Sequence, residues 1–160
     1  MENGTTSPPP AQPPSAWPLG LPFNPHLFGK LMARLGHTGW LDIGYHGHGP
    51  DWVELALPWR ADLAGDAASG VLASGPIISM MDLATSMAIC VKSGLLNNMV
   101  TIDLRVDYTR AAVPHRTVIG RGECYKLTRS VGFVRGIAHD GDPDDPIAHV
   151  AGSFMLLGDA

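Results

Sequence analysis

The 160-residue sequence has few cysteines, little net charge and a small aromatic content. Two cysteines, Cys90 and Cys124, are too few for a disulfide framework and fit a reducing compartment. The formal net charge is −4, so the sequence lacks the excess of basic residues that is typical of nucleic-acid-binding proteins. No apolar run approaches the roughly 18 residues of a membrane span, and the N-terminus lacks the pattern of a signal peptide. We therefore expect a cytoplasmic protein without a nucleic-acid or membrane partner.

Proline, serine and threonine are concentrated at the N-terminus, where branched apolar residues are scarce. This composition favours a disordered proline-rich tail over residues 1–20, because such a segment buries too little apolar surface to offset its conformational entropy. The remaining residues, 21–160, have a suitable length for one domain with a single core.

Two helices are predicted from the spacing of apolar residues. Between Asn24 and Gly36 these residues recur at helical spacing after an asparagine that can cap the first turn. A longer helix is predicted from Ser74, a suitable N-cap, to Gly94, a suitable terminator. It is apolar on almost every side, which predicts burial on every side. Because it contains Asp82, whose burial is costly without a partner, we expect this carboxylate to have a partner or a chemical role.

Six strands are predicted from alternating apolar and polar residues. They span residues 40–45, 52–57, 100–109, 117–127, 131–139 and 148–157. The first two would form a hairpin and the last four a meander, with Thr101 on the side away from the apolar residues of its strand. Segregated helices and antiparallel strands predict an α+β protein. An all-apolar helix must be wrapped by a curved antiparallel sheet, by another subunit, or by both.

Three segments carry a resemblance to a known family: GVLASGPIISMMDLATSMAI at residues 70–89, VTIDLRVDYTRAA at 100–112 and AHVAGSFML at 148–156. In this order and spacing they resemble hotdog-fold thioesterases of the PaaI-like or 4-hydroxybenzoyl-CoA thioesterase branch. The resemblance implies hydrolysis of an acyl-CoA or aryl-CoA thioester without a cofactor. It also implies a homodimer or homotetramer whose active sites lie between subunits.

The catalytic residues of this family can be assigned to positions of this chain by the same resemblance. Asp82 matches the helix acid that acts as general base or nucleophile. Ser74 and Gly75 match the paired glycines at the helix start, where a backbone amide polarises the thioester oxygen. The first turn of any helix offers such unpaired amides. Thr101 matches a strand hydroxyl that helps to hold the attacking water.

Three further residues are candidates for contact with the substrate. Arg129 and Ser130 match a connection that approaches coenzyme A in similar proteins, and arginine suits phosphate recognition. Arg110 is a weaker candidate for the same role. No metal site is expected, because the histidine-containing turn at residues 46–51 lacks a third ligand at a fixed spacing.

Two alternative interpretations remain open. Ser79 and Ser86 lie on the same helical side as Asp82, so Asp82 is either functional or a buried residue whose polarity these serines satisfy. The family's usual histidine and asparagine are replaced here by Ala73 and Ala67. These replacements favour the alternative of a non-catalytic acyl-CoA-binding or regulatory hotdog module.

Overall fold

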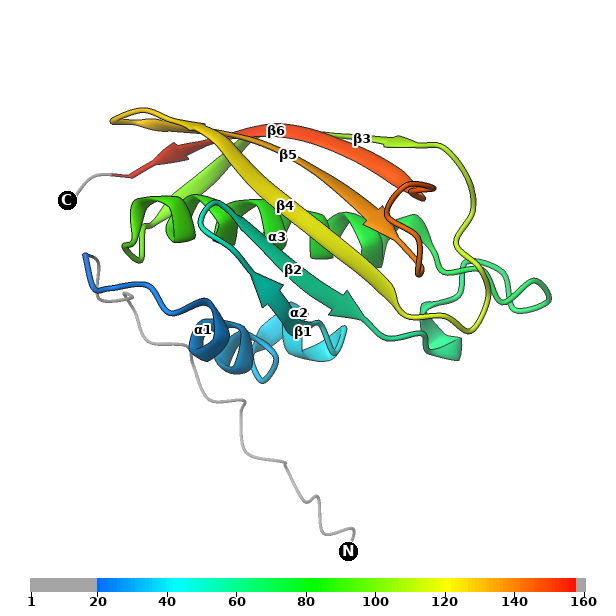
Figure 1. The fold of residues 1–160 in the computed structure, drawn as a ribbon. Helices are drawn as coiled ribbons and strands as arrows, with labels where there is room; N and C mark the ends of the chain where they lie inside the picture. Colours follow the sequence, from blue (N-terminus) through cyan, green and yellow to red (C-terminus); the bar gives the residue numbers. More distant parts are fainter. Residues whose placement is uncertain (1–19, 158–160) are drawn as a thin grey trace, which may run out of the picture.

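A six-stranded antiparallel sheet curves over one long helix in the computed structural model, which describes residues 20–157. Figure 1 shows the sheet above this helix and two short helices below it. The elements are α1 (Pro25–Met32), α2 (Gly36–Trp40), β1 (Gly44–His48), β2 (Trp52–Leu57), η1 (Ala61–Leu63), α3 (Ser74–Ser93), β3 (Met99–Tyr108), β4 (Val118–Leu127), β5 (Val131–His139) and β6 (Ala148–Leu156). This arrangement confirms the predicted α+β class and the curved sheet around a central helix. The predicted tail, apart from residue 20, lies outside the described residues.

The strands are ordered β1-β2-β4-β5-β6-β3 across the sheet. β1 and β2 form the predicted hairpin, and β4, β5 and β6 follow one another as predicted. The predicted four-strand meander is wrong for β3, which pairs with β6 rather than with β4. The chain enters α3 from β2 and leaves it for the opposite edge of the sheet, so order in the sequence does not give order in the sheet.

The predicted strand over residues 40–45 is correct only for its last two residues. Gly36–Trp40 forms the short helix α2, and β1 begins only at Gly44. Between them Asp42 adopts a left-handed backbone conformation with φ 59°, which interrupts extended structure. Side-chain polarity alone does not reveal such a turn.

The two ends of α3 differ in how well the sequence predicts them. Gly94 ends the helix in a left-handed conformation with φ 73°, as predicted. The predicted N-cap is wrong, because Ala73 is the N-cap residue and Ser74 is already helical. Alanine has no side-chain acceptor, so no side chain caps the first turn. The start of α3 therefore keeps exposed backbone donors.

One side of α3, which we call the closed face, packs tightly under the sheet. Met80, Met81, Ala84 and Ala88 on this face are all 0% exposed. A Cβ atom added at Gly122 of β4 would lie 2.6 Å from the backbone carbon of Ala84, so only glycine permits this approach of strand to helix.

By length and hydropathy α3 qualifies as a membrane span, contrary to the sequence-based expectation. Its burial under the sheet instead accounts for its apolar composition.

The other side of α3, which we call the open face, is not covered by the sheet. It carries Gly75, Ser79, Asp82 and Ser86, none of which is fully buried. The prediction that α3 is buried on every side is therefore wrong for the described chain. Next to the open face lies β3, which forms the outer edge of the sheet and exposes 56% of Ile102.

Candidate active site

The open face of α3 brings together two residues that lie far apart in the sequence. The Thr101 hydroxyl of β3 donates a hydrogen bond of 2.9 Å to Oδ1 of Asp82. Both side chains remain accessible, since Asp82 is half-buried and Thr101 is exposed. The bond fixes the orientation of the carboxylate without removing it from the surface.

A β-bulge in β3 explains why Thr101 reaches α3. In the pairing with β6, Thr101 lies opposite Phe154 and Asp103 lies opposite Ser153, so Ile102 has no partner. The extra residue reverses the alternation along the strand and directs Thr101 towards the helix. The predicted orientation of Thr101, away from the apolar side, is therefore wrong. A sequence pattern with period two does not register such an insertion.

The two serines near Asp82 do not satisfy its carboxylate. Ser79 Oγ donates to the Gly75 carbonyl oxygen at 3.1 Å, and Ser86 Oγ donates to the Leu83 carbonyl oxygen at 2.9 Å. Helical serines commonly form such bonds with the preceding turn. The interpretation of Asp82 as a buried residue satisfied by these serines is therefore wrong.

The start of α3 presents the backbone amides of Ser74 and Gly75, which have no acceptor among residues 20–157. The amides of Ser74 and Gly75 belong to the first turn, where a helix has no intrahelical acceptors. Pro76 has no N–H group, and Ile77 already donates to the carbonyl of the N-cap residue. Apart from its chain neighbours and the adjoining backbone of its own helix, a Cβ atom added at Gly75 would meet no atom of the described residues within 4 Å. Space for a ligand therefore adjoins the amides.

Tyr108 holds this helix start in place, a contact that the sequence did not predict. Its hydroxyl donates a hydrogen bond of 3.0 Å to the Ser74 carbonyl oxygen. Partial burial raises the pKa of the Tyr108 phenol, which keeps the hydroxyl protonated as a donor. Tyr108 is the last residue of β3, and its place in the alternating pattern of that strand gave no sign of this contact.

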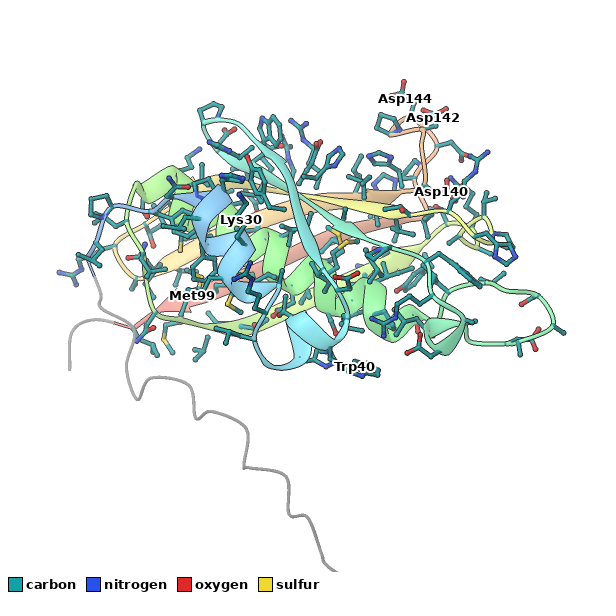
Figure 2. The ribbon with its side chains drawn as sticks, turned by 90° about the horizontal axis from the view of Figure 1, so that it is seen from below. Lys30, Trp40, Met99, Asp140, Asp142 and Asp144 are labelled. Atoms are coloured by element: carbon teal, nitrogen blue, oxygen red, sulfur yellow. The ribbon has the colours of Figure 1, made fainter. Side chains whose placement is uncertain are left out.

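A pocket of about 330 Å³ lies beside the helix start. Its lining includes Gly75 and Ser79 of α3 together with His37 and Trp40 of α2. His37 Nε2 lies 3.1 Å from Ser79 Oγ, and its ring stacks on Trp40 with centroids 6.0 Å apart. Trp40 lies at the outer side of the molecule, remote from the acidic turn of Asp142 (Figure 2). No local pattern in the sequence indicated a role for His37.

Arg110 is committed to a structural ion pair rather than to the site. Its guanidinium donates two hydrogen bonds to the Asp140 carboxylate, at 2.8 and 3.0 Å. These bonds, with a third from the Val113 amide, lower the pKa of Asp140 to about 2. The pair ties the segment after β3 to the end of β5. The predicted substrate contact of Arg110 therefore gains no support from the structure.

Arg129 and Ser130 lie far from the helix start within one chain. Both are exposed in the turn between β4 and β5. A Cβ added at nearby Gly132 would lie 2.5 Å from the Ile89 side chain, which places this turn near the C-terminal end of α3. One chain therefore does not bring these residues to the amides of Ser74 and Gly75. Within residues 20–157, no group of three or more potential ligands is arranged to hold a metal ion.

Comparisons with known proteins identify the family. A protein from Pseudomonas aeruginosa with a known crystal structure is 34% identical, with a TM-score of 0.73, over 81% of this chain and 96% of that chain. The family model of the thioesterase superfamily matches residues 69–147. The chain belongs to the thioesterase superfamily. No curated protein matches the chain.

More distant solved structures share the hotdog fold. A thioesterase from Haemophilus influenzae is 17% identical, with a TM-score of 0.73, over 88% of this chain and 94% of that chain. Zebra fish thioesterase superfamily member 2 is 19% identical, with a TM-score of 0.71, over 83% and 95%. Membership of the superfamily supports thioester hydrolysis in general. The PaaI-like or 4-hydroxybenzoyl-CoA branch stays a prediction.

Proposed function

We propose that this protein hydrolyses an acyl-CoA or aryl-CoA thioester on the open face of α3. The observation that carries the proposal is the 2.9 Å hydrogen bond from Thr101 to Asp82. It uses one oxygen of the carboxylate and leaves Oδ2 without a protein partner among the described residues. An oriented carboxylate with a free oxygen suits a general base.

The reaction needs a base, an oxyanion site and a leaving thiolate. Asp82 accepts a proton from water while the water oxygen adds to the thioester carbon. The carbonyl oxygen becomes an oxyanion, which the amides of Ser74 and Gly75 stabilise, each donor contributing about 3 kcal/mol. The carbon–sulfur bond then breaks and releases the acid and the thiolate.

The positions of these groups on one helix favour a site shared by two chains. Asp82 follows Gly75 by two turns of α3, which is about 10 Å along the helix axis. The first-turn amides point away from Asp82, towards the helix start. We therefore propose a homodimer in which the amides of one copy face Asp82 of the other. The unpaired edge of β3 and its exposed apolar side chains, such as Ile102, support an interface on this side.

Mixing two inactive variants tests this shared site. Asp82→Asn and Gly75→Val each damage one half of the site. In a mixed dimer with shared sites, one site carries both changes and the other carries neither. Subunit exchange should then restore about a quarter of wild-type activity, because half of the dimers are mixed and each has one intact site. Sites built within one chain would give no restoration, and a monomer in sedimentation would contradict the dimer.

A panel of aliphatic and aromatic CoA thioesters tests the activity itself. We expect Asp82→Asn to lower kcat by about a thousand-fold, as removal of a general base does, with unchanged unfolding. Asp142→Asn, in an exposed turn, is the matched control and should keep wild-type rates. Full activity of Asp82→Asn would exclude its assigned role, and the panel would identify the preferred acyl group.

The second candidate function is binding of acyl-CoA without turnover. Ala67 and Ala73, which replace polar residues usual in the family, favour this candidate. It predicts that the wild type binds a CoA thioester in calorimetry and releases no free thiol, and that Asp82→Asn binds equally well. Thiol release by the wild type would exclude it.

A further inference from the structure

The two hydrogen bonds around Ser79 form together when Nε2 of His37 carries a proton. Ser79 Oγ contacts the Gly75 carbonyl oxygen and His37 Nε2, each at 3.1 Å. A serine hydroxyl has one proton, and here it is donated to the carbonyl oxygen of Gly75. In this arrangement His37 Nε2 is the donor to Ser79 Oγ. A protonated imidazole nitrogen therefore lies within two hydrogen bonds of the residue that supplies an oxyanion amide.

The same pocket contains His37 and the proposed oxyanion site. Both His37 and Gly75 line the 330 Å³ pocket beside the start of α3. In a thioester, the sulfur and the carbonyl oxygen are bonded to the same carbon. A thioester whose oxygen is held at the Gly75 amide therefore has its sulfur close to Gly75, which lines this pocket. Stacking on Trp40 limits the orientations of the His37 ring.

The other ionisable side chain in the pocket lining is unsuited to donate a proton. Asp62 accepts hydrogen bonds of 3.0 and 2.9 Å from the guanidinium of Arg60, and these bonds lower the pKa of its carboxyl group. The hydroxyl of Ser79 is a far weaker acid than an imidazolium. Among the described lining residues, His37 is the imidazole in the pocket.

We propose that His37 protonates the leaving thiolate in the thioester hydrolysis proposed above, on which this inference rests. Water adds to the thioester carbon and its proton passes to the Asp82 that faces the Ser74 and Gly75 amides in the proposed dimer. The tetrahedral intermediate collapses, the carbon–sulfur bond breaks, and the electron pair stays on sulfur. That sulfur takes the Nε2 proton of His37 in its imidazolium form and leaves as a thiol, and His37 becomes a neutral imidazole. Afterwards Asp82 loses its proton to solvent and His37 gains one, so the net reaction is thioester plus water to acid plus thiol.

His37 belongs to none of the segments that carry the family resemblance. It lies on α2, upstream of residues 69–147 that the family model matches. The helix start itself offers only Ala73 before Ser74. A residue from a separate element thus brings an imidazole to the site through tertiary packing, and this contribution is a property of this chain.

Removal and replacement of the imidazole test the proposal. The readout is steady-state hydrolysis of the best CoA thioester by full-length wild type, His37→Ala and His37→Gln. We expect both variants to lower kcat by about a hundred-fold, the usual contribution of a general acid, with KM nearly unchanged. Added imidazole should restore at least a tenth of the rate in His37→Ala. It should do less in His37→Gln, whose side chain fills the space. His26→Gln, on exposed α1, is the matched control.

Each outcome decides between proton transfer and a structural role. Wild-type kcat in both variants would overturn the proposal. A raised KM with a rate that imidazole does not restore would also overturn it, since His37 would then only shape the pocket. A wild type that hydrolyses no thioester, or an unaffected Asp82→Asn variant, would instead refute the proposed function.

Discussion

The two faces of α3 differ in what they require: one must pack closely against the sheet, and the other must stay open to a ligand. On the closed face, Ala84 and the glycine at position 122 allow the backbones of helix and strand to approach, and water is excluded. On the open face, Gly75 is a glycine with empty space beside it, and Asp82 stays half-buried. The same residue type thus serves packing on one face and access on the other.

This difference shows how a small domain combines stability with a site. The closed face supplies buried apolar surface, at about 25 cal/mol for each Å². The open face keeps polar groups that a packed core would not tolerate without partners. Substitutions on the two faces should therefore separate into effects on unfolding and effects on turnover.

The largest effect on unfolding is expected for Gly122→Ala on the closed face. The added Cβ would lie 2.6 Å from the Ala84 backbone, so the helix must move away from β4. We expect the free energy of unfolding to fall by about 3 kcal/mol, the upper part of the range for overpacking. Denaturant unfolding followed by circular dichroism measures this change. An unchanged midpoint would show that α3 and β4 can move apart at this position with little loss of stability.

Gly75→Ala is the matched substitution on the open face. The added Cβ meets no atom of another described segment within 4 Å. The free energy of unfolding should therefore stay equal or rise slightly, since alanine is favoured over glycine in helices. We expect kcat/KM to fall about thirty-fold, or about 2 kcal/mol, because the methyl group hinders approach to the amide. Full activity would argue against an oxyanion site at Gly75.

Acid should weaken the link between the segment after β3 and the end of β5, which the ion pair of Arg110 with Asp140 forms. Its folded pKa of about 2 lies below the ordinary value, chiefly because Arg110 donates to the carboxylate. A depressed pKa stabilises the fold above about pH 4 and this contribution is lost as the pH falls towards 2. We expect a loss of about 1.5 kcal/mol between pH 5 and pH 2.5.

Comparison with Asp140→Asn isolates this contribution. The variant should be less stable than the wild type at pH 5, and the two stabilities should converge near pH 2. Hydrogen exchange should show the end of β3 opening first, because Arg110 lies two residues beyond that strand. Parallel pH curves for the two proteins would refute this role of the ion pair.

The smallest effect is expected for Thr101→Val, which keeps the shape of the side chain and removes its hydroxyl. The loss of the 2.9 Å bond to Asp82 should lower kcat about five-fold, or about 1 kcal/mol. Thr101→Ser should retain most of the activity because it keeps the donor. Equal rates for the valine and serine variants would show that the bond does not orient the base.

Several features were predictable because they depend on neighbours in the sequence. Asn24 caps α1 by accepting from the Leu27 amide at 2.9 Å, and Gly94 ends α3 as predicted. The α+β class and the pairing of β1 with β2 follow from periodicity and turn residues. The N-cap of α3 was mistaken by one residue, because Ala73 takes the cap without any side-chain bond.

The site was predictable only as a set of separate residues. The resemblance pointed to Asp82, Gly75 and Thr101, but their geometry depends on a bulge at Ile102 that the alternating pattern hides. His37 carried no local signal, since it reaches Ser79 across 42 positions of the chain. Contacts of this kind arise from packing.

The sequence by itself determined the helices, most strands, the apolar character of α3 and the aspartate within it. These properties follow from periodicity and from the preferences of residues within a few positions of one another. Only the tertiary structure decided which face of α3 is closed, where β3 joins the sheet, and which side chains meet Asp82 and Ser79. The physical reason is that burial and strand pairing depend on elements distant in sequence, and the spacing along one segment does not specify them.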